Sequence, residues 1–212
     1  MNKKIKLAVF DFDSTLMDGE TINILARELG FEDEVAKITK EAMSGNASFF
    51  ESLTKRVKLL KGLEVSKVNE VCANLPYING AKELISTLKS KDLTVVCFSG
   101  GFRNATSIAK NDLGFDADFS NILQEKDGVL TGEVGGDMMF DFSKGDMLQR
   151  LQALLNITPA ETMTVGDGAN DLSMFKFADT TVAFCAKEVV KKEAKIVIEE
   201  KDLTKILDYL DL

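Results

Sequence analysis

The stretch from Val9 to Thr15, VFDFDST, places two aspartates two residues apart, directly after an apolar run. Side chains alternate along an extended strand, so Phe12 is expected to point away while Asp11 and Asp13 share a side. Two like charges this close repel each other, and a hard divalent cation can offset that repulsion. The stretch therefore predicts a buried strand that ends at a charged site.

The composition excludes several classes of protein. Among 212 residues, 34 acidic side chains outnumber 26 basic ones, which gives a net charge of −8 and argues against nucleic acid or an anionic membrane as a partner. There is no histidine, which removes the commonest general base and zinc ligand. Cys72, Cys97 and Cys185 are expected to be buried thiols in a reducing compartment.

The amino-terminal apolar run stops at Asp11, which is too short for a signal peptide or a membrane span. We therefore expect a cytoplasmic protein. Because the first strand begins almost at residue 1, we also expect no fused regulatory domain. The sequence leaves monomer and homodimer open.

Short β-rich runs alternate with helical patterns along the chain. The candidate strands are 5–10, 93–98, 162–165, 180–184 and, as a fifth candidate, 195–199. Such alternation predicts an α/β fold with a Rossmann-like parallel sheet flanked by helices. An Asp-Gly pair within QEKDGVLTGEV, residues 124–134, predicts a β-hairpin excursion from that sheet.

The connection from Phe10 to Leu93 is too long for a single crossover helix. Apolar residues inside it recur at i, i+3, i+4 and i+7, the spacing of amphipathic helices. We expect a small helical cap domain over residues 17–75, inserted into a catalytic core made of residues 1–16 and 76–212.

Polar groups follow three of the candidate strands. They are Asp11 and Asp13, the SGG of 99–101, and the GDGAND of 166–171. Because the carboxyl ends of parallel strands share one edge of a sheet, these groups should meet in one crevice. A few carboxylates suit Mg²⁺, and Asp167 is the natural third ligand.

Each group also has an ordinary structural interpretation. Asp11 and Asp13 can be turn or cap residues, and Ser99 can be a plain serine at a strand end. Ser99 and the two glycine amides after it can equally cradle a phosphate. Asp171 can cap the helix that follows, support the metal ligands, or do both.

Lys144 stands at an awkward position. Ser143 and Asp146 have the spacing of an N-cap and N3 pair, which would put Lys144 in the first turn of a helix. The helix macrodipole disfavours a cation there. A solvated lysine is the ordinary interpretation, whereas attraction to a bound phosphate or to Asp11 explains the position better.

A carboxylate pair beside Mg²⁺, with a hydroxyl, free amides and a lysine, suits phosphoryl transfer. One aspartate can attack phosphorus, and the other can protonate the leaving alkoxide and later activate water. The spacing alone does not say which aspartate has which role.

In their order along the chain, DFDST, Ser99, Lys144 and GDGAND resemble the four motifs of the haloacid dehalogenase-like hydrolases. Within that superfamily, FDFDSTL, AMSGNASFFESLTKRVKLLKGL, SGGF and GDGANDLSM are similar to the phosphoserine phosphatases. The resemblance implies Asp11 as the nucleophile and Asp13 as the acid and base. It also implies Mg²⁺ held by the Asp11 carboxylate, the Asp13 backbone carbonyl and Asp167, with Asp171 in support.

The same resemblance implies how a phosphoserine substrate is held. Its phosphoryl group would meet Ser99, Gly100 and Lys144, with Asn170 nearby. In the cap, Glu20 would meet the substrate ammonium and Arg56 its carboxylate, while Met43 and Phe49 enclose the site. Read without the family, Arg56 can be a snorkelling surface arginine and Glu20 can complement a helix N-terminus.

The function that the resemblance implies is hydrolysis of phosphoserine, the last step of serine biosynthesis. Two alternatives stay open. The chain can act on another small phosphomonoester, as a phosphatase or a phosphotransferase. It can instead be a non-catalytic metal-binding module, because DFDSTLMDGE has acidic spacing loosely like that of a calcium loop, although the full ligand pattern is missing.

Overall fold

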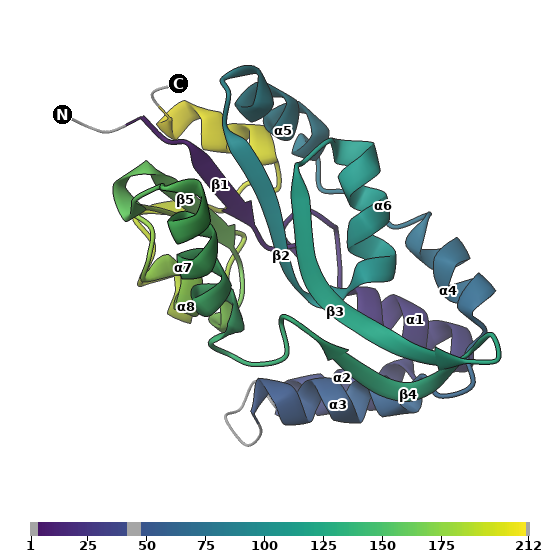
Figure 1. Ribbon diagram of the computed structural model, residues 1–212. Helices are drawn as coiled ribbons and strands as arrows, with labels where there is room; N and C mark the ends of the chain where they lie inside the picture. The colour runs from purple at the N-terminus through teal and green to yellow at the C-terminus, as the bar shows by residue number, and fades with distance from the viewer. Residues whose placement is uncertain (1–3, 42–47, 211–212) are drawn as a thin grey trace.

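The computed structural model describes residues 4–41 and 48–210. Its centre is a seven-stranded sheet in the order β4-β3-β2-β1-β5-β6-β7 (Figure 1). The strands are β1 (Leu7–Phe10), β2 (Thr94–Phe102), β3 (Ala117–Lys126), β4 (Val129–Gly136), β5 (Thr162–Gly166), β6 (Thr180–Phe184) and β7 (Ile196–Ile198). Every neighbouring pair is parallel except β3 with β4. The predicted α/β fold is confirmed.

Strand β1 is covered on both faces, which is why its sequence is apolar without interruption. Leu7 and Val9 belong to the buried cluster on the face covered by α7 (Ser143–Leu155) and α8 (Leu172–Phe175). Ala8 and Phe10 belong to the cluster on the opposite face. That face carries α5 (Ala81–Ser90) and α6 (Arg103–Leu113), as Figure 1 shows.

Four helices fill the long connection between β1 and β2. They are α1 (Thr21–Leu29), α2 (Glu32–Glu41), α3 (Phe49–Leu59) and α4 (Val65–Cys72). All four lie inside the range predicted for a helical insertion, and they gather beside the end of the sheet where β4 lies (Figure 1). The buried stripe of α1 includes Ile22, Leu25 and Ala26, as its spacing predicts.

The remaining elements are short. They are the 3₁₀ helices η2 (Pro159–Glu161), η3 (Ala169–Asp171) and η4 (Leu203–Tyr209), and the helix α9 (Glu188–Lys191). Among the residues that the structure describes, no helix is both long enough and apolar enough to cross a bilayer.

The β3–β4 hairpin is confirmed at its turn and is longer than expected. Asp127 and Gly128 both have positive φ, 53° and 81°, as a tight hairpin turn requires. The sequence reading missed that β3 begins at Ala117 and pairs with β2 in the main sheet. Much of β3 is half-buried or exposed, so it lacks the continuous apolar run that marks a central parallel strand.

Two local predictions were wrong. Ser143 is not an N-cap, because α7 begins at Ser143 itself with Phe142 in the cap position, and the Ser143 hydroxyl accepts the amide of Phe140 instead. Cys185 is exposed, whereas Cys72 and Cys97 are buried as expected.

Candidate active site

The chain turns sharply where β1 ends. The Asp11 amide donates to Val165 O at 2.9 Å, which continues the pairing of β1 with β5 up to the first aspartate. Ser14 then takes a left-handed conformation, with φ of 60°. The Met17 amide donates back to Phe12 O. This reversal leaves both aspartates at the carboxyl edge of the sheet and starts the chain toward α1.

Lys144 bridges two carboxylates at this edge. Its Nζ lies 2.7 Å from Asp11 Oδ1 and 2.6 Å from Asp171 Oδ1, and all three side chains are buried. Burial alone lowers the pKa of Lys144, but the charges of Asp11 and Asp171 outweigh it and raise that pKa above its usual value. Lys144 is therefore a permanent cation inside the site.

Asp171 uses both carboxylate oxygens within the protein. Oδ1 accepts from Lys144, while Oδ2 accepts from the amides of Asp167 and Gly168 at 3.0 and 2.9 Å. The side chain makes no capping bond to α8, although the residue stands at its N-cap position. Asp171 therefore holds the GDGAND turn and Lys144 in place.

Three carboxylates at this edge of the sheet form a candidate metal site. Ligand atoms of Asp11, Asp167 and Asp171 all lie within 4.8 Å of one another. Burial, followed by the charge of Asp171, raises the pKa of Asp167 to about 7 and that of Asp11 well above its usual value. Lys144 neutralises only part of the negative charge of these three carboxylates. Carboxylate oxygens suit a divalent cation, which would neutralise the rest.

Asp13 is held by the first residue of α1. Its Oδ1 accepts from the hydroxyl and from the amide of Thr21, at 2.5 and 2.9 Å. Burial, and then the charge of Glu20, raises the pKa of Asp13 to about 7. A carboxyl group that titrates near neutral pH can both give and accept a proton. The sequence reading missed Thr21.

The SGGF segment continues β2 as an irregular strand end, with the register shifting between Phe98 and Phe102. The Ser99 hydroxyl is buried and accepts the Gly101 amide at 2.9 Å. A Cβ at Gly101 would lie 2.7 Å from Asp13 Oδ2, so this close approach of strand and carboxylate needs glycine.

A cavity of about 200 Å³ opens over these groups. Of the predicted site residues, it is lined by Asp11, Asp13, Glu20, Phe49, Arg56, Gly100, Asp167 and Asn170. Ser99, Lys144 and Asp171 are buried and are not among the lining residues. Met43 lies outside the residues that the structure describes. The lining also includes Thr39, Asp141 and Lys187, which sequence reasoning missed.

Arg56 is buried in the wall of this cavity. Its Nε donates to Ser52 O at 3.3 Å and its Nη1 to the Thr39 hydroxyl at 3.4 Å. Within residues 4–41 and 48–210, no carboxylate forms an ion pair with it. Burial lowers the pKa of Arg56, and the nearby charges of Glu20 and Asp13 partly oppose that effect. A buried guanidinium without an anion is suited to receive one.

The cavity thus joins two kinds of chemistry. The sheet edge supplies carboxylates and a buried lysine, whereas the inserted segment supplies one carboxylate, Glu20, and one guanidinium, Arg56. The family model of the haloacid dehalogenase-like hydrolases matches residues 5–179. A phosphoserine phosphatase of Wolinella succinogenes is 63% identical over 206 residues, which cover 97% of this chain and 100% of the relative. The chain belongs to the phosphoserine phosphatase family of these hydrolases.

Other members of this family are similar over their full length. The phosphoserine phosphatase of Methanocaldococcus jannaschii is 48% identical over 210 residues, 99% of this chain and 100% of that one. A solved phospho-aspartyl intermediate analogue of phosphoserine phosphatase has a TM-score of 0.93 at 48% identity, with 99% and 100% of the chains covered. A substrate-bound phosphoserine phosphatase has a TM-score of 0.94 at 47% identity and the same coverage.

Proposed function

We propose that this chain is a Mg²⁺-dependent phosphoserine phosphatase, which hydrolyses O-phosphoserine to serine and phosphate through an aspartyl-phosphate on Asp11. In that role it performs the last step of serine biosynthesis in the cytoplasm. Residues 1–16 and 76–212 form the catalytic core, and residues 17–75 form the cap. The observation that carries the substrate assignment is the buried guanidinium of Arg56, which has no carboxylate partner among the described residues and lines the same cavity as Asp11.

Asp11 is the nucleophile in this proposal. Its Oδ1 accepts from Lys144 and from the Phe12 amide at 2.7 Å each, which fixes the rotation of the carboxylate. A fixed carboxylate meets phosphorus in one orientation, as an in-line displacement requires. The new bond joins an Asp11 oxygen to phosphorus, and the bond from phosphorus to the serine oxygen breaks.

Asp13 moves the protons. A carboxyl with a pKa of about 7 can give its proton to the departing serine oxygen. The resulting carboxylate then takes a proton from water, and that water oxygen attacks the phosphorus on Asp11. Phosphate leaves, and Asp11 and Asp13 return to their starting forms.

The other side chains neutralise charge and orient the substrate. Lys144, the Ser99 hydroxyl, the Gly100 amide and Asn170 hold the phosphoryl oxygens. The Asp11 carboxylate, the Asp13 backbone carbonyl and Asp167 would hold Mg²⁺, while Asp171 accepts hydrogen bonds from the Asp167 amide and from Lys144. When bound, the cation supplies positive charge where negative charge spreads in the transition state.

Recognition of the amino acid head belongs to the cap. Phosphoserine carries one ammonium and one carboxylate, which Glu20 and Arg56 complement in charge, with Phe49 closing the wall beside them. A guanidinium can take a carboxylate through two parallel hydrogen bonds. The Ser52 carbonyl accepts from Nε and the Thr39 hydroxyl from one N–H of Nη1, so the second N–H of Nη1 and both of Nη2 stay available for the substrate carboxylate.

The test is phosphate release from O-phosphoserine with and without Mg²⁺. Wild-type protein should release phosphate only with the cation, and Asp11→Asn, which keeps the shape and removes the nucleophile, should release none. A panel that includes phosphoethanolamine and other small monoesters should place phosphoserine first. Equal turnover across the panel would exclude the substrate assignment, and no turnover of any monoester would exclude the reaction.

A further inference from the structure

Three phenylalanines stack on the surface at one place. The rings of Phe50 and Phe140 lie 5.2 Å apart at 12° to each other, and those of Phe140 and Phe142 lie 5.3 Å apart at 1°. Their exposed fractions are 39%, 44% and 57% for Phe50, Phe140 and Phe142. Rings in contact bury part of one another, so this stack is held together although it faces water.

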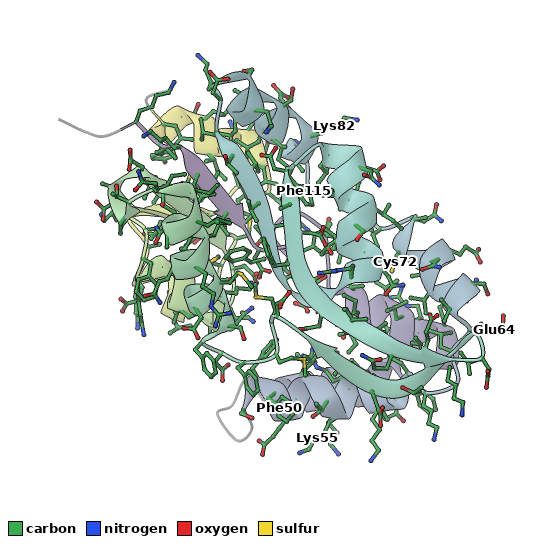
Figure 2. The ribbon with its side chains drawn as sticks, in the orientation of Figure 1. Phe50, Lys55, Glu64, Cys72, Lys82 and Phe115 are labelled. Carbon is green, nitrogen blue, oxygen red and sulfur yellow. The ribbon has the colours of Figure 1, made fainter. Side chains whose placement is uncertain are left out.

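The stack joins two parts of the chain. Phe50 lies in the first turn of α3, whereas Phe140 and Phe142 lie in the segment that links β4 to α7. Figure 2 shows Phe50 at the end of α3 nearest that segment. The stack is therefore a surface contact between the inserted helix α3 and the segment before α7.

The core side of the stack is rigid. The Phe140 amide donates to the Ser143 hydroxyl at 3.1 Å, and the Ser143 amide donates to Phe140 O at 3.0 Å. Just upstream, the Met138 amide and carbonyl both bond the side chain of Asn121. The segment therefore presents Phe140 to α3 in a fixed position.

The opposite end of α3 is fixed in a different way. After the helix ends, the Gly62 amide donates to Leu130 O at 2.9 Å, and the Leu130 amide donates to Leu63 O at 2.9 Å. These bonds tie the chain to β4. The helix is thus attached to the hairpin at its carboxyl end and to the core by the stack at its amino end.

Four residues of α3 line the cavity, of which Phe49 and Arg56 are predicted site residues. Phe49, next to Phe50, covers Gly100 so closely that a Cβ there would lie 2.6 Å from the ring. Arg56 follows two turns later along the same helix. Asp141, between the other two rings, lines the same cavity. The stack therefore sits at the rim of the site.

We propose that the stack of Phe50, Phe140 and Phe142 sets the placement of α3 over the cavity, and that these rings are positioning residues that act through Phe49 and Arg56. The inference rests on the proposed function, since it gives Arg56 the substrate carboxylate to bind. Loss of the stack removes the surface contact at the amino end of α3, where Phe49 still packs against Gly100. The Arg56 guanidinium then spends less time in the orientation that binds the substrate carboxylate.

The test compares two substrates in Phe140→Ala. The KM for phosphoserine should rise about fivefold, the scale of one aromatic pair, while kcat changes by less than about twofold because Asp11 and Asp13 are untouched. The kcat/KM for phosphoethanolamine, which lacks the carboxylate, should change much less. Phe140→Tyr should behave as wild type because it restores the ring.

Two further variants sharpen the result. Phe50→Ala should reproduce the effect, and the double variant should be no worse than either single one, because each change removes the same contact. Phe31→Ala is the matched control: Phe31 lies between α1 and α2 of the insertion, is 39% exposed like Phe50, and its removal should leave both substrates unaffected.

Hydrogen exchange separates failure of this inference from failure of the proposed function. Amides at the start of α3 should exchange faster in Phe140→Ala whether or not phosphoserine is the substrate. Unchanged exchange and an unchanged KM would overturn the positioning role. An altered sedimentation coefficient with an unchanged KM would also overturn it, and would make the stack a contact between copies of the chain.

Discussion

The Thr21 hydroxyl donates to Asp13 Oδ1 at 2.5 Å, so the first residue of an inserted helix holds the carboxyl proposed as acid and base. Thr21→Val removes this bond and keeps the shape. We expect kcat on phosphoserine to fall about tenfold, the effect of losing one hydrogen bond to a charged group, with KM little changed. Steady-state kinetics measure this, and Thr21→Ser should restore the rate. An equal loss in the serine variant would contradict the role given to the hydroxyl.

Removal of the Arg56 guanidinium should change selectivity more than it changes chemistry. In Arg56→Ala, kcat/KM for phosphoserine should fall by about 100-fold, the scale of an unpaired charge in a buried site. Phosphoethanolamine should lose far less. Arg56→Lys should recover little, because an ammonium cannot make the paired bonds of a guanidinium. Equal losses on both substrates would mean that Arg56 does not contact the carboxylate.

The buried cation between Asp11 and Asp171 should matter for stability as well as activity. Lys144→Met leaves two buried carboxylates unpaired, so the free energy of unfolding without metal should fall by about 3 kcal/mol. Urea denaturation measures it. Lys176→Met, an exposed lysine at the end of α8, is the control and should change stability by less than about 0.5 kcal/mol. Similar values for the two variants would contradict the buried-pair account.

A divalent cation should stabilise the protein through the carboxylates at the sheet edge. At a Mg²⁺ concentration about 100-fold above its Kd, the gain should be about 2.7 kcal/mol, seen as a higher midpoint of thermal unfolding. Asp167→Asn should lose most of this gain. Asp179→Asn is the control, because Asp179 is not among the cavity's lining residues and the gain should persist. Equal stabilisation of both variants would place the metal elsewhere.

Parts of the fold that depend on local sequence were predictable. The uninterrupted apolar run of β1 and the aspartates that follow it predict a buried strand that ends at a charged site. The Asp127–Gly128 pair predicts the hairpin turn. Strand β3 was missed because its pattern is mixed, and only its pairing with β2 makes it part of the sheet. The capping role expected for Ser143 failed because its hydroxyl bonds the Phe140 amide instead.

The candidate site also has parts that were predictable from the sequence and parts that were not. Asp11, Asp13 and Asp167 follow strands whose ends had to meet, so their proximity was predictable. The contact of Thr21 with Asp13 depends on the left-handed turn at Ser14, with φ of 60°. A serine gives little sign of such a turn in sequence, and a threonine that begins a helix suits many roles.

The central claim is that Asp11 carries the phosphoryl group during turnover. The direct measurement is to quench the wild-type protein with acid while it turns over phosphoserine in the presence of Mg²⁺. The protein is then digested, and the mass of the peptide that contains VFDFDST is measured by mass spectrometry. The account predicts a peptide heavier by one phosphoryl group located on Asp11, and none in Asp11→Asn. Turnover with no phosphorylated peptide, or with the group on another residue, would contradict it.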